Sequence, residues 1–194
     1  MTASPNITRD RLQGLNVYLV GMMGAGKSSV GKILARKLEY RFFDTDTLAE
    51  RVAGRAIKDI FARDGEAAFR ELETQVLAQL ASCTRSAIAT GGGIVVTRKN
   101  WSYLHQGVTI WLDASAEILM QRLRHDRNRP LLKTPDPAAT LAELLEQRRP
   151  LYAQADLHLQ ILPDDTPTTV ASRAIASIPG ILKAPSPDRP ELDR

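Results

Sequence analysis

The feature that most constrains this chain is the segment GMMGAGKS at residues 21–28. It fits the P-loop pattern, in which a glycine and four further residues precede Gly-Lys-Ser or Gly-Lys-Thr. The apolar run LNVYLV before it predicts a buried strand, and SSVGKILARKL after it has the spacing of an amphipathic helix. A P-loop in this setting predicts a nucleotide-binding α/β domain.

Each part of the loop has a physical task. Its glycines let the backbone curl so that N–H groups face phosphate oxygens, and the positive end of the following helix points to the same place. Lys27 is expected to reach the β- and γ-phosphates, and Ser28 is expected to bind Mg²⁺. A glycine-rich turn with a coincidental lysine is the alternative, and it leaves the full pattern unexplained. The predicted ATP-binding residues of the loop are Gly24, Ala25, Gly26, Lys27, Ser28 and Ser29.

The rest of the chain alternates short apolar runs with amphipathic segments. Strands are predicted at 41–44, 86–90, 108–112 and 157–162, and helices at 47–54, 57–65, 65–82, 116–124, 138–154 and after Thr166 and Pro167. Such alternation is typical of a parallel sheet that helices cover on both faces. We therefore predict a three-layer α/β fold with a short parallel sheet.

The length of 194 residues allows one substantial core, so we predict a single domain at 15–178. It follows an N-terminal extension at 1–14 and precedes a proline-rich tail at 179–194, which we expect to be disordered. Residues 124–137 carry charges and prolines without periodicity between two predicted helices, which favours a mobile lid. An ordinary surface loop is the alternative for that segment.

Composition excludes several classes of protein. The hydrophobic fraction of 43% and the charged fraction of 25% fit a globular protein. No run approaches the ~18 to 20 apolar residues of a membrane span, and the first residues lack the apolar core of a secretory signal, so we expect a cytoplasmic protein without membrane contact. Cys83 is the only cysteine, and we expect it to be buried and inert.

The net charge of +4 could indicate nucleic-acid binding. However, the Lys and Arg residues are dispersed, and an aromatic content of 5% offers little surface for stacking bases. An anionic small-molecule substrate explains the excess charge equally well. We therefore expect small-molecule substrates, no nucleic-acid partner and a monomer.

Two carboxylates follow the apolar pair Phe42 and Phe43, in the sequence Asp44-Thr45-Asp46. Alternate positions of a strand share a face, so both carboxylates are expected to point into the same crevice. One can support a metal ion while the other orients an acceptor hydroxyl. A helix cap at either aspartate is the alternative.

Further polar and glycine residues extend this set. The predicted helix GEAAFRELE carries Arg70 and Glu73, and three glycines at 91–93 follow the predicted strand SAIAT directly. Three glycines cost conformational entropy, so close approach of the backbone to a ligand explains them better than chance. Arg129 lies in the segment RPLL and Arg148 in RRPLY; singly, each would more often be a solvated surface charge.

Together these motifs closely resemble the shikimate kinases, over residues 16 to 178. The six segments that carry the resemblance are GMMGAGKS, DTD, GEAAFRELE, GGG, RPLL and RRPLY. The resemblance implies the three-layer P-loop kinase fold related to nucleoside monophosphate kinases, with a substrate-binding helical region at about 45–73. It further implies transfer of the γ-phosphate of ATP to the 3-hydroxyl of shikimate with Mg²⁺ as cofactor, in aromatic amino-acid (chorismate) biosynthesis.

The resemblance also implies roles at the substrate end of the site. The residue matching Asp46 contacts the hydroxyls of shikimate and serves as the base. The arginines matching Arg70 and Arg148 bind the carboxylate of the substrate, and the backbone of the glycine matching Gly92 contacts the substrate. We therefore expect these four residues to bind shikimate.

At the nucleotide end, the resemblance implies that Asp44 supports Mg²⁺ together with Ser28. The lid arginine, Arg129, is implied to reach the phosphates, while Arg122 and Pro167 match positions that sandwich adenine. The predicted catalytic residues are Asp46, Lys27 and Arg129.

Other functions remain open at this point. A gluconate kinase or a nucleoside monophosphate kinase would share the fold, ATP and Mg²⁺, and a non-catalytic regulatory domain could keep the fold alone. Asp113 could also be mistaken for a metal-binding aspartate, because it follows the apolar run VTIWL. We predict that Asp113 is no magnesium ligand and that Asp113 or Ser115 caps the helix that follows.

Overall fold

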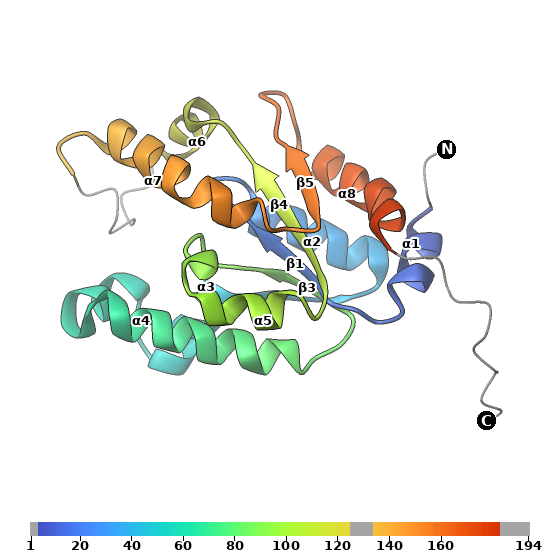
Figure 1. Cartoon of the computed structure of the whole chain (residues 1–194), viewed down its shortest axis with the longest axis horizontal. Coiled ribbons are helices and arrows are strands. Elements are labelled where there is room, and N and C mark those ends of the chain that lie inside the picture. The colour runs from blue at the N-terminus through green and yellow to red at the C-terminus, as the bar shows by residue number, and fades with distance from the viewer. Residues whose placement is uncertain (1–3, 125–133, 183–194) are drawn as a thin grey trace.

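Five parallel strands form one sheet in the part of the chain that the computed structural model describes, residues 4–124 and 134–182 (Figure 1). Their order across the sheet is β2-β3-β1-β4-β5. The strands are β1 (Val17–Val20), β2 (Arg41–Asp44), β3 (Ser86–Ala89), β4 (Val108–Asp113) and β5 (Leu157–Gln160). Each pair of neighbours is parallel, and Val17 of β1 lies in register with Ala87 of β3 and Val108 of β4. The predicted parallel α/β fold is confirmed.

Helices lie on both sides of this sheet. They are α1 (Pro5–Leu12), α2 (Lys27–Leu38), α3 (Thr45–Ala53), α4 (Ile57–Ala81), α5 (Trp101–Leu104), α6 (Ala116–Leu123), α7 (Pro137–Tyr152) and α8 (Pro167–Ile181), with short 3₁₀ turns at Ile94–Val96 and Arg98–Asn100. Helices α1, α2 and α8 pack against one another, and α4 and α5 lie together away from them (Figure 1). The three layers follow from the alternation of strand and helix along the chain.

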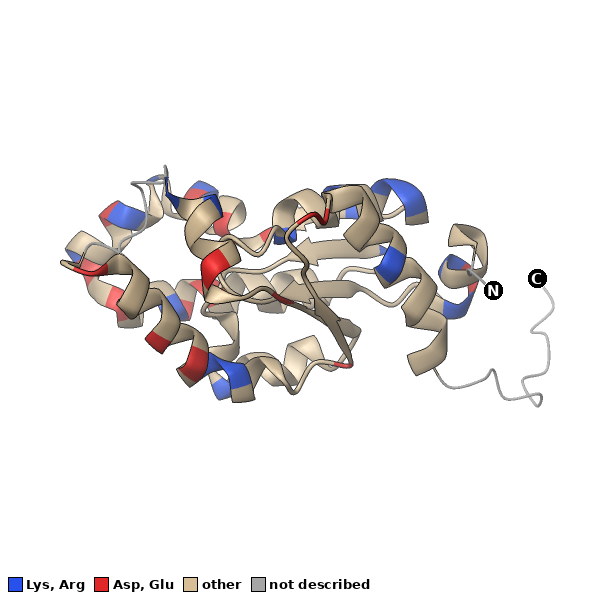
Figure 2. Ribbon diagram, turned by 90° about the horizontal axis from the view of Figure 1, so that it is seen from above, with Lys and Arg blue, Asp and Glu red and all other residues tan. Residues whose placement is uncertain are grey.

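The sequences of the strands reflect this coverage. All residues of β1 and β3 are buried, as are the first five residues of β4. Strands that are covered on both faces have continuous apolar runs, because neither face meets water. Charged residues of both signs are instead distributed over the helices, as Figure 2 shows.

Helix α4 changes direction at Gly65, where φ is 83° and ψ is 172°. This backbone conformation is comfortable for glycine alone, so the residue separates two helical segments. The sequence predicted two segments that meet at Gly65, and the structure agrees. The second segment carries Arg70 and Glu73 toward the sheet.

Helix α1, which precedes β1, packs against the folded core. Leu12 of α1 is fully buried, and the hydroxyl of Thr8 donates to the backbone oxygen of Ile175 in α8 at 2.9 Å. At the other end, α8 continues through Pro179 to Ile181, beyond the start predicted for the tail. Residues 183–194 of that tail lie outside the described residues.

Two further expectations, on Cys83 and on membrane-spanning segments, can be compared with the structure. Cys83 was expected to be buried, but it is only half-buried, because the turn after α4 leaves it near the surface. Within residues 4–124 and 134–182, no helix is both long enough and apolar enough to span a membrane.

Candidate active site

Two adjoining cavities open at the carboxyl ends of the central strands. One has a volume of about 500 Å³ and is lined by the P-loop, Arg122 and Pro167. The other, of about 560 Å³, is lined by α3, α4 and the three glycines after β3. Residues shared by both cavities are Met23, Ser28, Asp44, Asp46 and Gly92. Ligands of open parallel sheets bind in this crevice, so the two cavities form one candidate site.

The P-loop has the backbone that its glycines predicted. Gly24 and Gly26 have φ of 82° and 96°, and Gly26 immediately precedes the first residue of α2. The ammonium of Lys27 is buried and donates to the carbonyls of Gly21 and Met22 at 2.7 and 2.9 Å. The loop therefore holds a cation and the N-terminus of α2 at the same place, which is the arrangement that binds phosphate groups.

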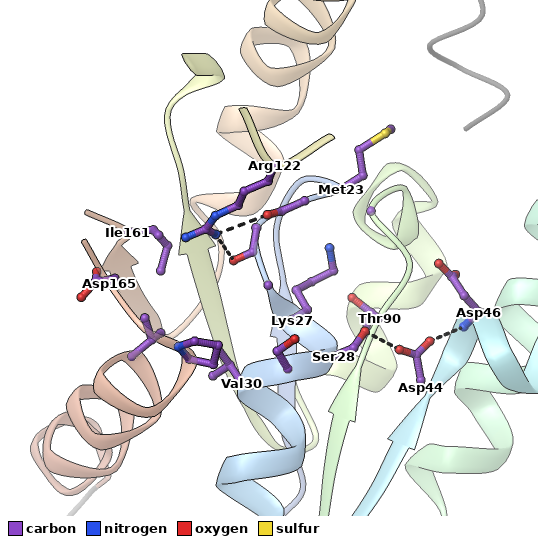
Figure 3. A pocket seen from close by; sticks show the side chains of 17 residues that line it. Met23, Lys27, Ser28, Val30, Asp44, Asp46, Thr90, Arg122, Ile161 and Asp165 are labelled. Atoms are coloured by element: carbon purple, nitrogen blue, oxygen red, sulfur yellow. Dashed lines mark hydrogen bonds between the residues drawn. The ribbon is translucent and has the colours of Figure 1, made fainter. Parts of the chain in front are cut away.

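Asp44 fills the helix cap that the sequence offered as an alternative, and it also contacts the P-loop. Its Oδ2 accepts a hydrogen bond of 2.5 Å from the hydroxyl of Ser28, while its Oδ1 accepts from the N–H groups of Asp46 and Thr47 at 3.1 and 3.4 Å. The carboxylate thus caps α3 and also lies beside the P-loop serine (Figure 3). The hydrogen bonds of this helix cap therefore hold in place the Asp44 carboxylate, which is predicted to support the metal ion.

The donor set at Ser28 and Asp44 fits Mg²⁺. A hydroxyl and a carboxylate are hard oxygen ligands, and Mg²⁺ in nucleotide sites binds few protein groups because phosphates and water complete its shell. Over residues 4–124 and 134–182 there is no cluster of three or more His, Cys, Asp or Glu that could hold a metal ion.

The expected placement of Asp46 on a strand is wrong. Strand β2 ends at Asp44, and Asp46 lies in the first turn of α3. The reason is the cap itself, because the carboxylate of Asp44 binds the N–H groups that follow and starts the helix at once. Asp46 still lines both cavities, so the two aspartates meet at the site by a different route.

Each of the three glycines lies close to other groups of the site. A Cβ atom at Gly91 would lie 2.4 Å from Oε1 of Glu73 and 2.6 Å from Oδ1 of Asp46. A Cβ atom at Gly93 would lie 2.2 Å from Nη1 of Arg70, whereas Gly92 closely faces the P-loop backbone at Met23. Real Cβ atoms do not approach other atoms within 3.0 Å, so Gly91 and Gly93 leave room for the acidic and basic side chains of the site.

Arg70 lies between two carboxylates of its own helix. Its Nη1 donates to Glu73 at 2.9 Å, and its Nη2 donates to Glu66 at 2.8 Å. The side chain of Glu73 is 1% exposed. Burial raises the pKa of Glu73 to about 7, against the opposing effect of Arg70, and the nearby charge of Asp46 adds to the rise. Oε1 of Glu73 has no hydrogen-bond partner in the described part of the chain.

Arg148 reaches the same cavity from α7. Its side chain is buried, and its Nη1 donates to the carbonyl of Gly92 at 3.3 Å. The predicted substrate-binding residues Asp46, Arg70, Gly92 and Arg148 therefore all line the second cavity.

Residues outside the P-loop also line the first cavity. Arg122 donates to the carbonyls of Gly24 and Ala25, both at 3.3 Å, and lies across the pocket from Asp44 (Figure 3). Ile161 and Asp165 also lie away from Asp44 (Figure 3), and Pro167 and Val170 line the same cavity. The predicted pair Arg122 and Pro167 thus lines the first cavity. Arg129 and most of the predicted lid lie outside the described residues.

Comparison with known proteins decides the family. The family model described as shikimate kinase matches residues 23–179. The chain belongs to the shikimate kinase family. The shikimate kinase of Microcystis aeruginosa is 55% identical over 178 residues, which cover 92% of this chain and 94% of that protein. The shikimate kinase of Rippkaea orientalis is also 55% identical, over 91% of this chain and 94% of that protein.

Solved structures agree with this assignment. Shikimate kinase from Acinetobacter baumannii in complex with shikimate has a TM-score of 0.80 and 37% identity, covering 88% of this chain and 96% of that one. A gluconokinase from Sinorhizobium meliloti has a TM-score of 0.55 at 18% identity, covering 87% of this chain and 94% of that one, which shows a shared fold alone. The predicted shikimate kinase, an ATP-dependent phosphotransferase, is confirmed.

Asp113 lies outside both cavities of this shikimate kinase family member. Its Oδ2 accepts from Nη1 of Arg149 at 3.2 Å and lies 2.9 Å from Nε2 of His158. Ser115 caps α6, because its hydroxyl oxygen accepts from the N–H of Ile118. Of the two residues proposed for the cap, Ser115 is therefore the one that fills it.

Sequence reasoning missed functions for two motif residues. The hydroxyl of Thr45 accepts from the N–H of Gly91 at 2.8 Å, which joins α3 to the glycine loop. Tyr152 is fully buried and donates to the carbonyl of Gly92. Thr45 lies in the motif DTD and Tyr152 in RRPLY, so membership of these motifs was the one sign in the sequence that the two residues contribute to the site.

Proposed function

We propose that this chain transfers the γ-phosphate of ATP to the 3-hydroxyl of shikimate, which gives shikimate 3-phosphate and ADP. The observation that carries the proposal is the pair of adjoining cavities, one at the P-loop and one at Arg70 and Arg148, which share Asp46. A phosphate donor and an anionic acceptor would meet at that residue. The solved relative with shikimate bound supports the same substrate.

The chemistry asks the protein mainly to position its reactants. Phosphoryl transfer has a loose transition state, so holding the hydroxyl in line and neutralising the γ-phosphate oxygens supply most of the catalysis. Asp46 would accept the proton of the 3-hydroxyl as its oxygen bonds to the γ-phosphorus. The bond from that phosphorus to the bridging oxygen breaks, and ADP leaves with the electron pair.

Charge at the γ-phosphate would be neutralised from several sides. Lys27 at the P-loop and Arg129, which lies outside the described residues, are the proposed protein cations. Ser28 and Asp44 would hold Mg²⁺, which neutralises phosphate charge when bound. Arg122 and Pro167 would enclose adenine in the first cavity.

The substrate carboxylate would be bound by the two arginines and the glycine loop. A guanidinium has five N–H groups, and the three hydrogen bonds of Arg70 to Glu66 and Glu73 leave two of them for a carboxylate. Charge-assisted hydrogen bonds of this kind contribute about 1.5 to 3 kcal/mol each. They would select an acid over a neutral sugar.

One assay tests the proposal. ADP release by the full chain with MgATP is followed with shikimate, with gluconate, with a nucleoside monophosphate and with no acceptor. We expect release to depend on shikimate, and equal release with gluconate or without an acceptor would refute the proposal. Since one chain lines both cavities, we also propose a monomer, and the cytoplasmic location expected from the sequence stays a prediction.

A further inference from the structure

A buried tyrosine holds the glycine loop of the site. Tyr152 is the last residue of α7, is fully buried, and its hydroxyl donates to the carbonyl of Gly92 at 2.5 Å. Its ring stacks on Trp111 of β4 with 5.9 Å between ring centroids and 25° between the planes. Burial raises the pKa of Tyr152 to about 12, so the hydroxyl keeps its proton and remains a donor at neutral pH.

The same carbonyl has a second donor one helical turn earlier. Nη1 of Arg148 lies 3.3 Å from the carbonyl oxygen of Gly92, and a carbonyl can accept two hydrogen bonds. Arg148 lines the substrate cavity, whereas Tyr152 lines neither cavity. Of the two donors, Arg148 is thus the one that a substrate can reach.

The direction of this carbonyl also sets the direction of an N–H group. The peptide between Gly92 and Gly93 is planar and trans, so its N–H points opposite to its C=O. With the carbonyl turned toward α7, the N–H of Gly93 points away from α7. Among the described residues, neither Gly92 nor Gly93 donates its backbone N–H to another protein group. Three consecutive glycines would otherwise sample many backbone conformations.

We propose that Tyr152 is a positioning residue for the acidic substrate, an inference that rests on the proposed function. Its hydroxyl holds the Gly92 carbonyl, which fixes the direction of the Gly93 N–H beside the cavity that Gly93 lines, and it leaves Arg148 free to bind the substrate carboxylate. Without the hydroxyl, Arg148 is the remaining donor to that carbonyl. If Arg148 then turned to the substrate, the buried carbonyl of Gly92 would have no donor, so shikimate would bind more weakly.

The test is Tyr152→Phe, which removes the hydroxyl and keeps the ring on Trp111. We expect the KM for shikimate to rise about tenfold, which corresponds to the loss of one hydrogen bond, while kcat and the KM for ATP change less than about twofold. Tyr18→Phe is the matched control, because it removes the hydroxyl of another fully buried tyrosine, on β1. The control should leave all three constants unchanged.

An unchanged KM for shikimate in Tyr152→Phe would overturn the proposal, and so would a parallel rise in the KM for ATP, which indicates general loosening. The double variant Tyr152→Phe with Arg148→Lys tests whether Tyr152 acts through Arg148. If Tyr152 acts through Arg148, removal of its hydroxyl should weaken shikimate binding less in that background than in the wild type. If Tyr152→Phe weakened shikimate binding equally in the wild type and in Arg148→Lys, an effect through Arg148 would be contradicted.

A measurement on the wild-type protein covers the case in which Tyr152→Phe does not fold. The amide proton of Gly93, followed by NMR, should shift and exchange more slowly with solvent when shikimate is added. An unchanged amide signal would overturn the proposal. Failure of the wild type to phosphorylate shikimate would instead refute the proposed function, so the two failures are distinguishable.

Discussion

Glu73 allows a sharp test of whether burial or its arginine partner controls a carboxylate at the site. Its side chain is 1% exposed, and Arg70 donates to it at 2.9 Å. Burial disfavours the ionised carboxylate, whereas Arg70 favours it. Burial is the larger effect, and it raises the pKa of Glu73 from 4.5 to about 7.

The sign of the pH dependence follows from linkage. A carboxyl group whose pKa is higher in the folded than in the unfolded protein binds its proton more tightly when folded. The group therefore contributes stability below pH 4.5, and this contribution is lost as the pH rises through 7. Between pH 5 and pH 8 the loss amounts to about 2 to 3 kcal/mol, because one unit of pKa corresponds to about 1.4 kcal/mol.

The perturbation is Glu73→Gln, which removes the titration and nearly preserves the shape. Urea unfolding of both proteins from pH 5 to pH 8 gives the difference in unfolding free energy, in which titrations common to both proteins cancel. We expect the wild type to lose about 2 to 3 kcal/mol relative to the variant over this range. Glu66→Gln is the control, because it removes an exposed carboxylate that also contacts Arg70, and it should show no comparable change.

One result would refute the reasoning. A constant difference between wild type and Glu73→Gln from pH 5 to pH 8 would mean that the pKa of Glu73 in the folded protein is not raised above its ordinary value of 4.5. In that case Arg70 would balance or outweigh the effect of burial.

Three further predictions concern the chemistry of the site. Asp46→Asn should lower kcat about 100-fold or more with little change in the KM for ATP, because it removes the proposed base, and near-normal turnover would contradict that role. Gly93→Ala should raise the KM for shikimate in steady-state assays, since a Cβ atom there would displace Arg70; an unchanged KM would show that the arginine can move without loss. In titrations of turnover with Mg²⁺, Asp44→Asn should need much more metal, whereas Asp113→Asn should keep the normal Mg²⁺ dependence. Asp113→Asn should lower the free energy of unfolding by about 1 kcal/mol or less, because the ion pair that it removes with Arg149 is partly exposed. The opposite ranking would overturn the metal assignment.

The sequence by itself determined the elements and the chemistry that is encoded locally. The P-loop is recognisable because its glycine spacing and the helix after it are local requirements of phosphate binding. The break at Gly65 and the start of α8 at Thr166 and Pro167 were also readable, because backbone conformation and capping depend on neighbouring residues. Six motifs in order were enough to predict the family.

Only the tertiary structure decided how the motifs meet. Asp44 caps α3, so Asp46 reaches the site from a helix, a result that alternation along a strand could not predict. The glycine triplet makes room for side chains from α3 and α4, and its carbonyl is held by Tyr152 from α7. These contacts join residues up to 60 positions apart, and they depend on how helices pack on the sheet. Periodicity describes which face of an element is buried, whereas the partner on that face is chosen by packing across the whole fold.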